Sequence, residues 1–295
     1  MSRAVAWLRA SRLPSQSYIA PPLLLGQALA HRATGRFDGG VCALLLIFGL
    51  CDQLLIVYAN DYADRANDQL NRTATPFSGG SRVLVDGALS PSAVLRAGVA
   101  AAIGTLLISG VLALAYDRRH SIPLGLLALF LVWAYSYQPL RLSYRGGGEL
   151  LQALGVGLCL PLFGYYNQSG ELGSFPWALL WALLPTHLAC AMATAMPDEP
   201  SDRLGDKRTS AVWLGGRRAR RVIVLLEATT VAALIALARG PGLTASYVWV
   251  APALLTALLA LGPPGEPGSD RLSVQVAVAI AVTVSTVLGL TLAAL

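Results

Sequence analysis

Charged residues are scarce in this chain of 295 residues: only 13% are Asp, Glu, Lys or Arg, while 55% are hydrophobic. The mean hydropathy is accordingly high, at +0.58. This composition is typical of an integral membrane protein rather than of a soluble enzyme. Because no low-complexity segment or soluble domain interrupts the pattern, we expect one domain over residues 1–295.

Histidine and cysteine are also rare, which limits the chemistry open to the chain. The three histidines, at positions 31, 120 and 187, are scattered and form neither a metal-ligand pair nor a histidine-based catalytic arrangement. The four cysteines lie inside apolar runs at spacings that suit neither a metal site nor a disulfide framework. We expect His187 to be hydrogen-bonded within the protein and the cysteines to be small core residues.

Long hydrophobic runs are the abundant feature of the sequence. A helix needs about 20 apolar residues to cross a bilayer, and nine candidate spans are centred near residues 23, 50, 104, 130, 157, 185, 230, 253 and 284. They predict an all-α fold, a polytopic membrane bundle of nine transmembrane helices. The first run follows three arginines, as a signal peptide would, but without a small-residue cleavage pattern, so we interpret it as a retained helix.

The basic residues predict how the bundle is oriented in its membrane. With the N-terminus in the cytoplasm, seventeen of the 22 Lys and Arg residues fall in inner segments, in agreement with the positive-inside rule. We therefore expect a cytoplasmic N-terminus, an outer C-terminus and, without a transit peptide, a bacterial inner membrane. The net charge of +6 and the pI of 9.4 then reflect topology and anionic membrane lipid rather than nucleic-acid binding.

Two cytoplasmic connections, residues 61–92 and 197–221, are long, and long polar loops in a compact bundle usually carry function. Each opens with an acidic cluster and continues into a Gly-containing basic patch: NDYADRAND then SGGSR, and PDEPSDRLGD then KRT. This shared plan hints at two related halves. We expect two Asp-rich loops on the cytoplasmic side, where the site would open.

The acidic residues are spaced like one face of a helix, at i, i+3, i+7 in the first cluster and i, i+4, i+8 in the second. The members are Asp61, Asp64 and Asp68, and Asp198, Asp202 and Asp206. Solvated loop acids would explain one such cluster but not two. Mg²⁺ accepts one or two carboxylates and keeps sites for water and phosphate oxygens, so the two clusters predict a Mg²⁺-diphosphate clamp.

Polar residues beside the clusters are candidates for further roles. Arg82 follows SGG, whose glycines let backbone amides approach a phosphate. Lys207 follows the second cluster, and Arg141 lies in a third basic loop, YQPLRLSYRGGGE. Asn60 either caps a helix or completes a metal shell. Asp52 lies inside the second span, where an acid costs about 3 kcal/mol to insert, so it must face the bundle interior, a cavity or a hydrogen-bonding partner.

Together these residues resemble the UbiA superfamily of intramembrane prenyltransferases, over nearly the whole chain. The family's first aspartate-rich signature is similar to residues 60–68, and its second to residues 198–202. SGGSRVLVDGALSP, YRGGGELLQALGVGLCLPLFGYYNQSG and DKRTSAVWLGG further resemble the 1,4-dihydroxy-2-naphthoate branch, MenA. The chain departs from that branch at Val57, where an Asn is usual, and at Asp206, where a Gly is usual.

The resemblance implies a Mg²⁺-dependent enzyme that transfers a prenyl or polyprenyl group from an allylic diphosphate to an aromatic acceptor. It implies 1,4-dihydroxy-2-naphthoate or a related quinone precursor as acceptor, in menaquinone-type biosynthesis. The implied metal ligands, which are also the catalytic residues, are Asp61, Asp64, Asp68, Asp198 and Asp202. The implied diphosphate contacts are Asn60, Arg82, Arg141 and Lys207.

Three other functions stay open at this point. A UbiA-type terpene cyclase would use the same ionising site without a second substrate. An ion-coupled carrier would place its ionisable residues near the bilayer midplane, often at broken helices, whereas these acids cluster at one membrane face. A non-catalytic lipid-binding scaffold would not need two acidic clusters flanked by cations.

Overall fold

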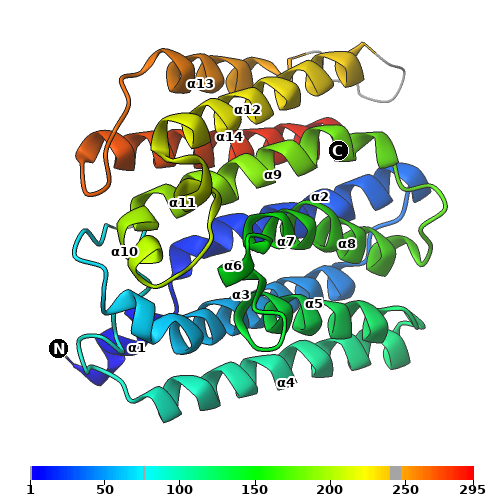
Figure 1. Cartoon of the computed structure of the whole chain (residues 1–295). Helices are drawn as coiled ribbons and strands as arrows, with labels where there is room; N and C mark the ends of the chain where they lie inside the picture. Colours follow the sequence, from blue (N-terminus) through cyan, green and yellow to red (C-terminus); the bar gives the residue numbers. More distant parts are fainter. Residues whose placement is uncertain (1, 76, 240–246) are drawn as a thin grey trace.

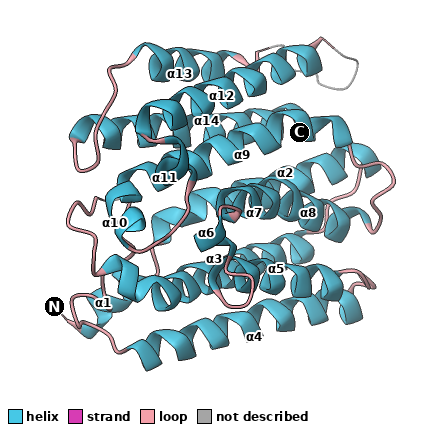
Figure 2. Ribbon diagram, viewed as in Figure 1, coloured by secondary structure: helices cyan, strands magenta, loops and turns pink. Residues whose placement is uncertain are grey.

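The computed structural model of the chain describes residues 2–75, 77–239 and 247–295, and within these ranges it is a bundle of helices without strands (Figure 2). The helices up to the middle of the chain are α1 (Arg3–Ala10), α2 (Gln16–Thr34), α3 (Gly39–Asp68), α4 (Pro91–Ala115), α5 (Ser121–Ser136), α6 (Leu142–Arg145), α7 (Gly148–Leu154) and α8 (Leu160–Ser169). They are followed by α9 (Leu180–Ala195), α10 (Glu199–Leu204), α11 (Ser210–Leu214), α12 (Gly216–Ala238), α13 (Val250–Leu261) and α14 (Asp270–Ala294).

Several of these helices form longer rods. A π-helical segment, Gly155–Cys159, joins α7 to α8, and a 3-10 turn, Met196–Asp198, joins α9 to α10. Each of the nine predicted centres lies in a helix or rod, although α5 and α13 are shorter than the others, with 16 and 12 residues. In the described part of the chain six of these are long and apolar enough to cross a membrane: α3, α4, the α7–α8 rod, the α9–α10 rod, α12 and α14. A helical membrane protein is therefore confirmed, and nine crossings stay a prediction.

The expectation of Asp-rich loops is wrong for the five predicted metal ligands, because they lie on helices. Asp206 follows the end of α10 in a turn. α3 continues through Asp68, so its three acids occupy its last turns, and the connection to α4 begins only after them. Pro197 and Pro200 each start a new helical turn without ending the rod. Proline at the first position of a turn lacks only an N–H that would be unpaired there anyway.

The described part of the bundle stacks its helices side by side (Figure 1), with α2 near the middle, packed against α8, α3 and α14. α4 and α5 pack beyond α3, while α12 packs on α9 and α13 on α14. At the left in Figure 1, α1 and α10 gather where α3 ends. The acidic ends of α3 and of the α9–α10 rod therefore meet at one end of the bundle.

Glycines set the closest helix contact. A Cβ atom at Gly26 of α2 would overlap the carbonyl oxygen of Pro161, and one at Gly164 of α8 would overlap that of Leu23. Small residues let helix backbones approach closely, and such packing drives association where lipid removes the hydrophobic driving force. The contact fixes α2 against the α7–α8 rod.

One smaller prediction is also confirmed. The Nδ1 atom of His187 lies 2.7 Å from the carbonyl oxygen of Leu183, so this histidine is hydrogen-bonded within the bundle. The cysteines are all free, but only Cys190 is a buried core residue, while Cys42, Cys51 and Cys159 are half-buried.

Gly164→Ala is expected to lower the thermal unfolding midpoint in detergent, because the added methyl group overpacks the α2–α8 contact by about 1–3 kcal/mol. Gly110→Ala on α4 is the matched control, since a Cβ atom there meets nothing within 4 Å and alanine favours the helix. Equal midpoints for the two variants would contradict this packing.

Candidate active site

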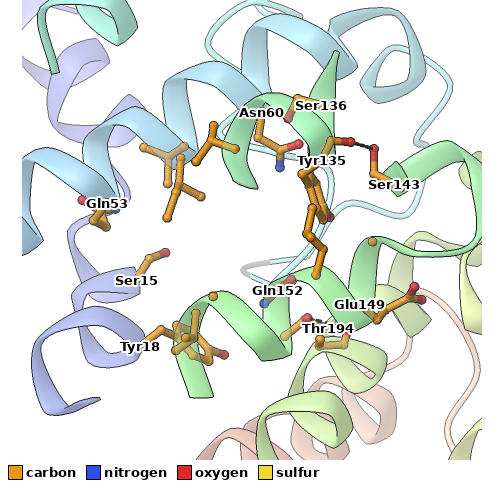
Figure 3. Close-up of a pocket in the computed structure, with 18 of the residues that line it drawn as sticks. Ser15, Tyr18, Gln53, Asn60, Tyr135, Ser136, Ser143, Glu149, Gln152 and Thr194 are labelled. Carbon is orange, nitrogen blue, oxygen red and sulfur yellow. Dashed lines mark hydrogen bonds between the residues drawn. The ribbon is translucent and has the colours of Figure 1, made fainter. Parts of the chain in front are cut away.

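A cavity of about 480 Å³ lies inside the bundle, between α2, α3, α5 and the α7–α8 and α9–α10 rods. Along α3 its wall changes from apolar to acidic, from Phe48 and Ile56 to Asp64 and Asp68 near the end of that helix. Figure 3 shows Asn60 and Tyr135 on one side of the cavity, with Gln53, Ser15 and Tyr18 on another. The cavity therefore joins an acidic end to an apolar chamber.

The first acidic cluster has one enclosed member and two that face the cavity. Asp64 and Asp68 line the cavity, as does Asn60, one turn before Asp64. Asp61 is not part of the lining and is only 3% exposed. Its carboxylate accepts hydrogen bonds from the side chain of Arg12 and from the hydroxyl and backbone N–H of Ser81.

The second cluster meets the first through two asparagines. Asn67 of α3 donates from Nδ2 to Oδ1 of Asp202 at 2.9 Å. Asn71 donates in the same way to Oδ1 of Asp198 at 2.6 Å. Both Asp198 and Asp202 line the cavity, so the structure brings together acids that are more than a hundred residues apart. Asp206 is exposed and lies outside the cavity lining.

The segment Ser78–Ser81 folds between the two clusters. The N–H of Gly79 donates to Oδ1 of Asp198 at 2.9 Å, so these amides contact carboxylates. Gly80 has a φ of +66°, and a Cβ atom there would lie 2.5 Å from Oδ2 of Asp68. Only glycine combines this backbone conformation with so close an approach, which explains the SGGS sequence.

Two cations neutralise the acids directly. The Nζ atom of Lys207 lies 3.0 Å from Oδ2 of Asp64 and 3.8 Å from Oδ1 of Asp202. Burial alone would lower the pKa of Lys207, but the two carboxylates raise it well above its ordinary value. Arg12 pairs with Asp61 and also lines the cavity. Sequence analysis missed this role, because Arg12 lies 49 residues from its partner in a run of N-terminal arginines.

Two predicted cations lie outside the cavity lining, in contrast to our expectation. Arg82 donates from Nη1 to the carbonyl oxygen of Asn71 at 3.2 Å, which supports the segment that holds Asp198. The guanidinium of Arg141 stacks on the ring of Tyr144, 3.5 Å from its centroid. Both arginines are therefore placed to support the site rather than to line it.

The oxygen donors fit a hard divalent cation. No group of three or more His, Cys, Asp or Glu residues in the described ranges is arranged as a ready metal site, because Arg12 and Lys207 pair with the acids instead. Nevertheless Oδ1 of Asp64, of Asn60 and of Asn67 are buried without a hydrogen-bond partner among the described residues. Carboxylate and amide oxygens are ligands that Mg²⁺ accepts, and such unsatisfied buried atoms require an explanation.

Comparison with known proteins identifies the family. Residues 19–263 match the sequence model of the UbiA prenyltransferase family, which is most of the chain. The chain belongs to the UbiA prenyltransferase family. The sequence-based identification of an intramembrane prenyltransferase is thereby confirmed.

Two named relatives of this UbiA-family chain are a phytyltransferase and an octaprenyltransferase. It is 26% identical to a 2-carboxy-1,4-naphthoquinone phytyltransferase of Synechocystis sp., over 74% of this chain and 69% of that one. It is 31% identical to a 4-hydroxybenzoate octaprenyltransferase of Aeromonas salmonicida, over 64% of this chain and 61% of that one. A UbiA homologue from Archaeoglobus fulgidus, solved bound to DMAPP and Mg²⁺, shares the fold with a TM-score of 0.69 and 18% identity, over 94% of this chain and 98% of that one.

Gly80→Ala is expected to reduce prenyl transfer by about 100-fold, because its methyl group displaces Asp68 and small misplacements of catalytic groups are this costly. Gly87→Ala is the matched control: Gly87 also has a φ of +66°, but a Cβ atom there meets nothing within 4 Å. The two variants share the backbone strain, so both unfolding midpoints should fall, but only Gly80→Ala should lose activity. Equal activities would contradict the placement of this segment.

Proposed function

We propose that this protein transfers a prenyl or polyprenyl group from an allylic diphosphate to 1,4-dihydroxy-2-naphthoate or a related aromatic quinone precursor, in menaquinone-type biosynthesis. The observation that carries the proposal is the cavity, whose acidic end continues into an apolar chamber. A prenyl diphosphate has the same division between a charged head and a hydrocarbon tail. The names of the Synechocystis and Aeromonas relatives support an aromatic acceptor of this class.

We assign Mg²⁺ to the acidic end. The residues that would hold it are Asp61, Asp64, Asp68, Asp198 and Asp202, with Asn60 in support. Bound Mg²⁺ supplies Lewis-acid stabilisation of the negative charge that develops on a leaving diphosphate. The archaeal homologue bound to Mg²⁺ and DMAPP supports this assignment, as do the unpartnered oxygens of Asp64 and Asn60.

The protein's own side chains contribute positive charge beside the diphosphate and an apolar wall that excludes water. Lys207 lies 3.0 Å from Asp64 and brings one cation to the cavity wall, and Arg12 brings a second. Fixed cations beside the leaving diphosphate stabilise its charge as the carbon–oxygen bond breaks. Phe48, Ile56 and Leu131 form part of the apolar wall, which keeps water away from the allylic cation until the aromatic ring attacks it.

The same proposal covers the placement of the protein in its membrane. We propose a single domain over residues 1–295 in a bacterial inner membrane, with the N-terminus and the acidic end of the cavity facing the cytoplasm and the C-terminus outside. In Figure 1 the N-terminus lies at the end of the bundle where α3 and α10 meet, and the C-terminus lies away from it. The distribution of basic residues supports the orientation.

The reaction is tested with protein purified in detergent or nanodiscs and a labelled polyprenyl diphosphate, with Mg²⁺ or EDTA. The acceptor panel is 1,4-dihydroxy-2-naphthoate, 4-hydroxybenzoate, homogentisate and no acceptor. We expect Mg²⁺-dependent transfer to the naphthoate, which EDTA abolishes. A cyclised hydrocarbon formed without acceptor would indicate a terpene cyclase instead, and absence of diphosphate release would contradict the proposal altogether.

Asp198→Asn is expected to lower the rate of transfer at least 100-fold, since the loss of a metal ligand removes several kcal/mol of transition-state stabilisation. Asp117→Asn serves as the control, because Asp117 is exposed and pairs only with Arg119 at the surface, where ion pairs contribute little. Wild-type rates in Asp198→Asn would exclude the second cluster from the chemistry.

A further inference from the structure

Two acids that line the cavity, Asp52 and Glu149, are not used by the proposed metal site. Glu149 accepts a hydrogen bond from the N–H of Ser210, which leaves Asp52. Asp52 lies well inside α3, its side chain lines the cavity, and the residue is 4% exposed. Among the residues that the structure describes, its carboxyl group forms no hydrogen bond or ion pair, although the thiols of Cys51 and Cys159 lie near it. An acid within a membrane helix is unfavourable and usually marks a functional position. Asp52 is therefore available to a ligand that enters the cavity.

Asp52 belongs to a stripe of cavity residues along α3. Phe48, Asp52, Ile56 and Asn60 follow one another at intervals of four, so they share one helix face, and all four line the cavity. At 1.5 Å per residue, Asp52 lies about 12 Å beyond Asn60 along the helix axis. It is thus separated from the metal site and flanked by apolar side chains.

Neither part of the prenyl substrate satisfies this carboxyl group. The hydrocarbon tail has no hydrogen-bond donor, and the anionic diphosphate belongs with the cations at the opposite end of the cavity. A suitable partner combines a hydrogen-bond donor with an apolar body, as an aromatic hydroxyl does. Oε1 of Gln53 is buried without a partner in the described ranges, and the hydroxyl of Tyr18 lies against the thiol of Cys190. Figure 3 shows Tyr18 and Gln53 on one side of the cavity.

We propose that Asp52 is the residue that binds the aromatic acceptor, by accepting a hydrogen bond from a ring hydroxyl. Tyr18 and Gln53 provide further polar contacts on the same wall. The π-helical segment between α7 and α8 contributes Val156 and Cys159 to this cavity, and such segments are frequent at functional sites. This inference rests on the proposed function, because it requires an aromatic second substrate.

The test measures KM separately for 1,4-dihydroxy-2-naphthoate and for the prenyl diphosphate, in Asp52→Leu and Asp52→Asn. We expect Asp52→Leu to raise the KM for the acceptor about 10- to 100-fold, as the loss of a hydrogen bond to a charged group would. The KM for the prenyl diphosphate should change less than about twofold, because Asp52 lies about 12 Å from Asn60. Asp52→Leu removes an acid from a membrane helix, so the variant should insert and fold.

A monomethyl ether of the acceptor adds a second readout. Methylation of the acceptor hydroxyl and the Asp52→Leu substitution remove the same hydrogen bond. Wild-type protein should therefore bind the ether as weakly as Asp52→Leu binds the unmethylated acceptor. Asp52→Leu itself should bind the ether and the unmethylated acceptor with nearly equal affinity. Asp117→Asn should leave both KM values unchanged.

Two results would overturn the assignment of Asp52 alone. The first is an unchanged KM for the acceptor in both Asp52 variants. The second is a changed KM for the prenyl diphosphate together with an unchanged KM for the acceptor. That second result would place Asp52 beside the hydrocarbon tail of the prenyl diphosphate. Absence of aromatic prenylation by the wild-type protein would overturn both this inference and the proposed function, so the two failures are distinguishable.

Discussion

The mutual repulsion of carboxylates at one end of the bundle is the constraint on which the rest of the structure depends. Acids of two separate segments lie close together there, and the protein neutralises them from several directions at once. Lys207 pairs with Asp64, Arg12 pairs with Asp61, and the N–H of Gly79 donates to Asp198. Because each donor comes from a different part of the chain, the acidic end also ties the N-terminus, α3 and α10 to one another.

This arrangement explains how a membrane protein can hold so much charge next to an apolar chamber. The five acids proposed as metal ligands lie on helices, whose backbone groups are satisfied internally, as a bilayer environment requires. The glycine contact between α2 and α8 keeps the chamber walls fixed. A substrate with a charged head and a hydrocarbon tail matches both halves of the cavity, and the chain belongs to the UbiA prenyltransferase family.

The sequence predicted those features that depend on local spacing. Apolar runs located the helices, and the intervals between aspartates showed that Asp61 and Asp64 lie near one another on one helix. Features set by long-range contacts were missed: Arg12 reaches Asp61 across 49 residues, and Arg82, although next to the SGG segment, donates to Asn71 instead of lining the cavity. Helix ends were also misjudged, because the polar composition of the last turns of α3 resembles that of a loop.

The most direct test of the central claim, that these acids hold metal for a diphosphate, is a titration with Mn²⁺ as a paramagnetic substitute for Mg²⁺. Electron paramagnetic resonance would count the bound ions in the presence of an unreactive prenyl diphosphate analogue. The account predicts tight binding to the wild-type protein that depends on the analogue and is lost in an Asp61→Asn, Asp198→Asn double variant. Unchanged binding in that variant would show that the metal lies elsewhere and would contradict the account.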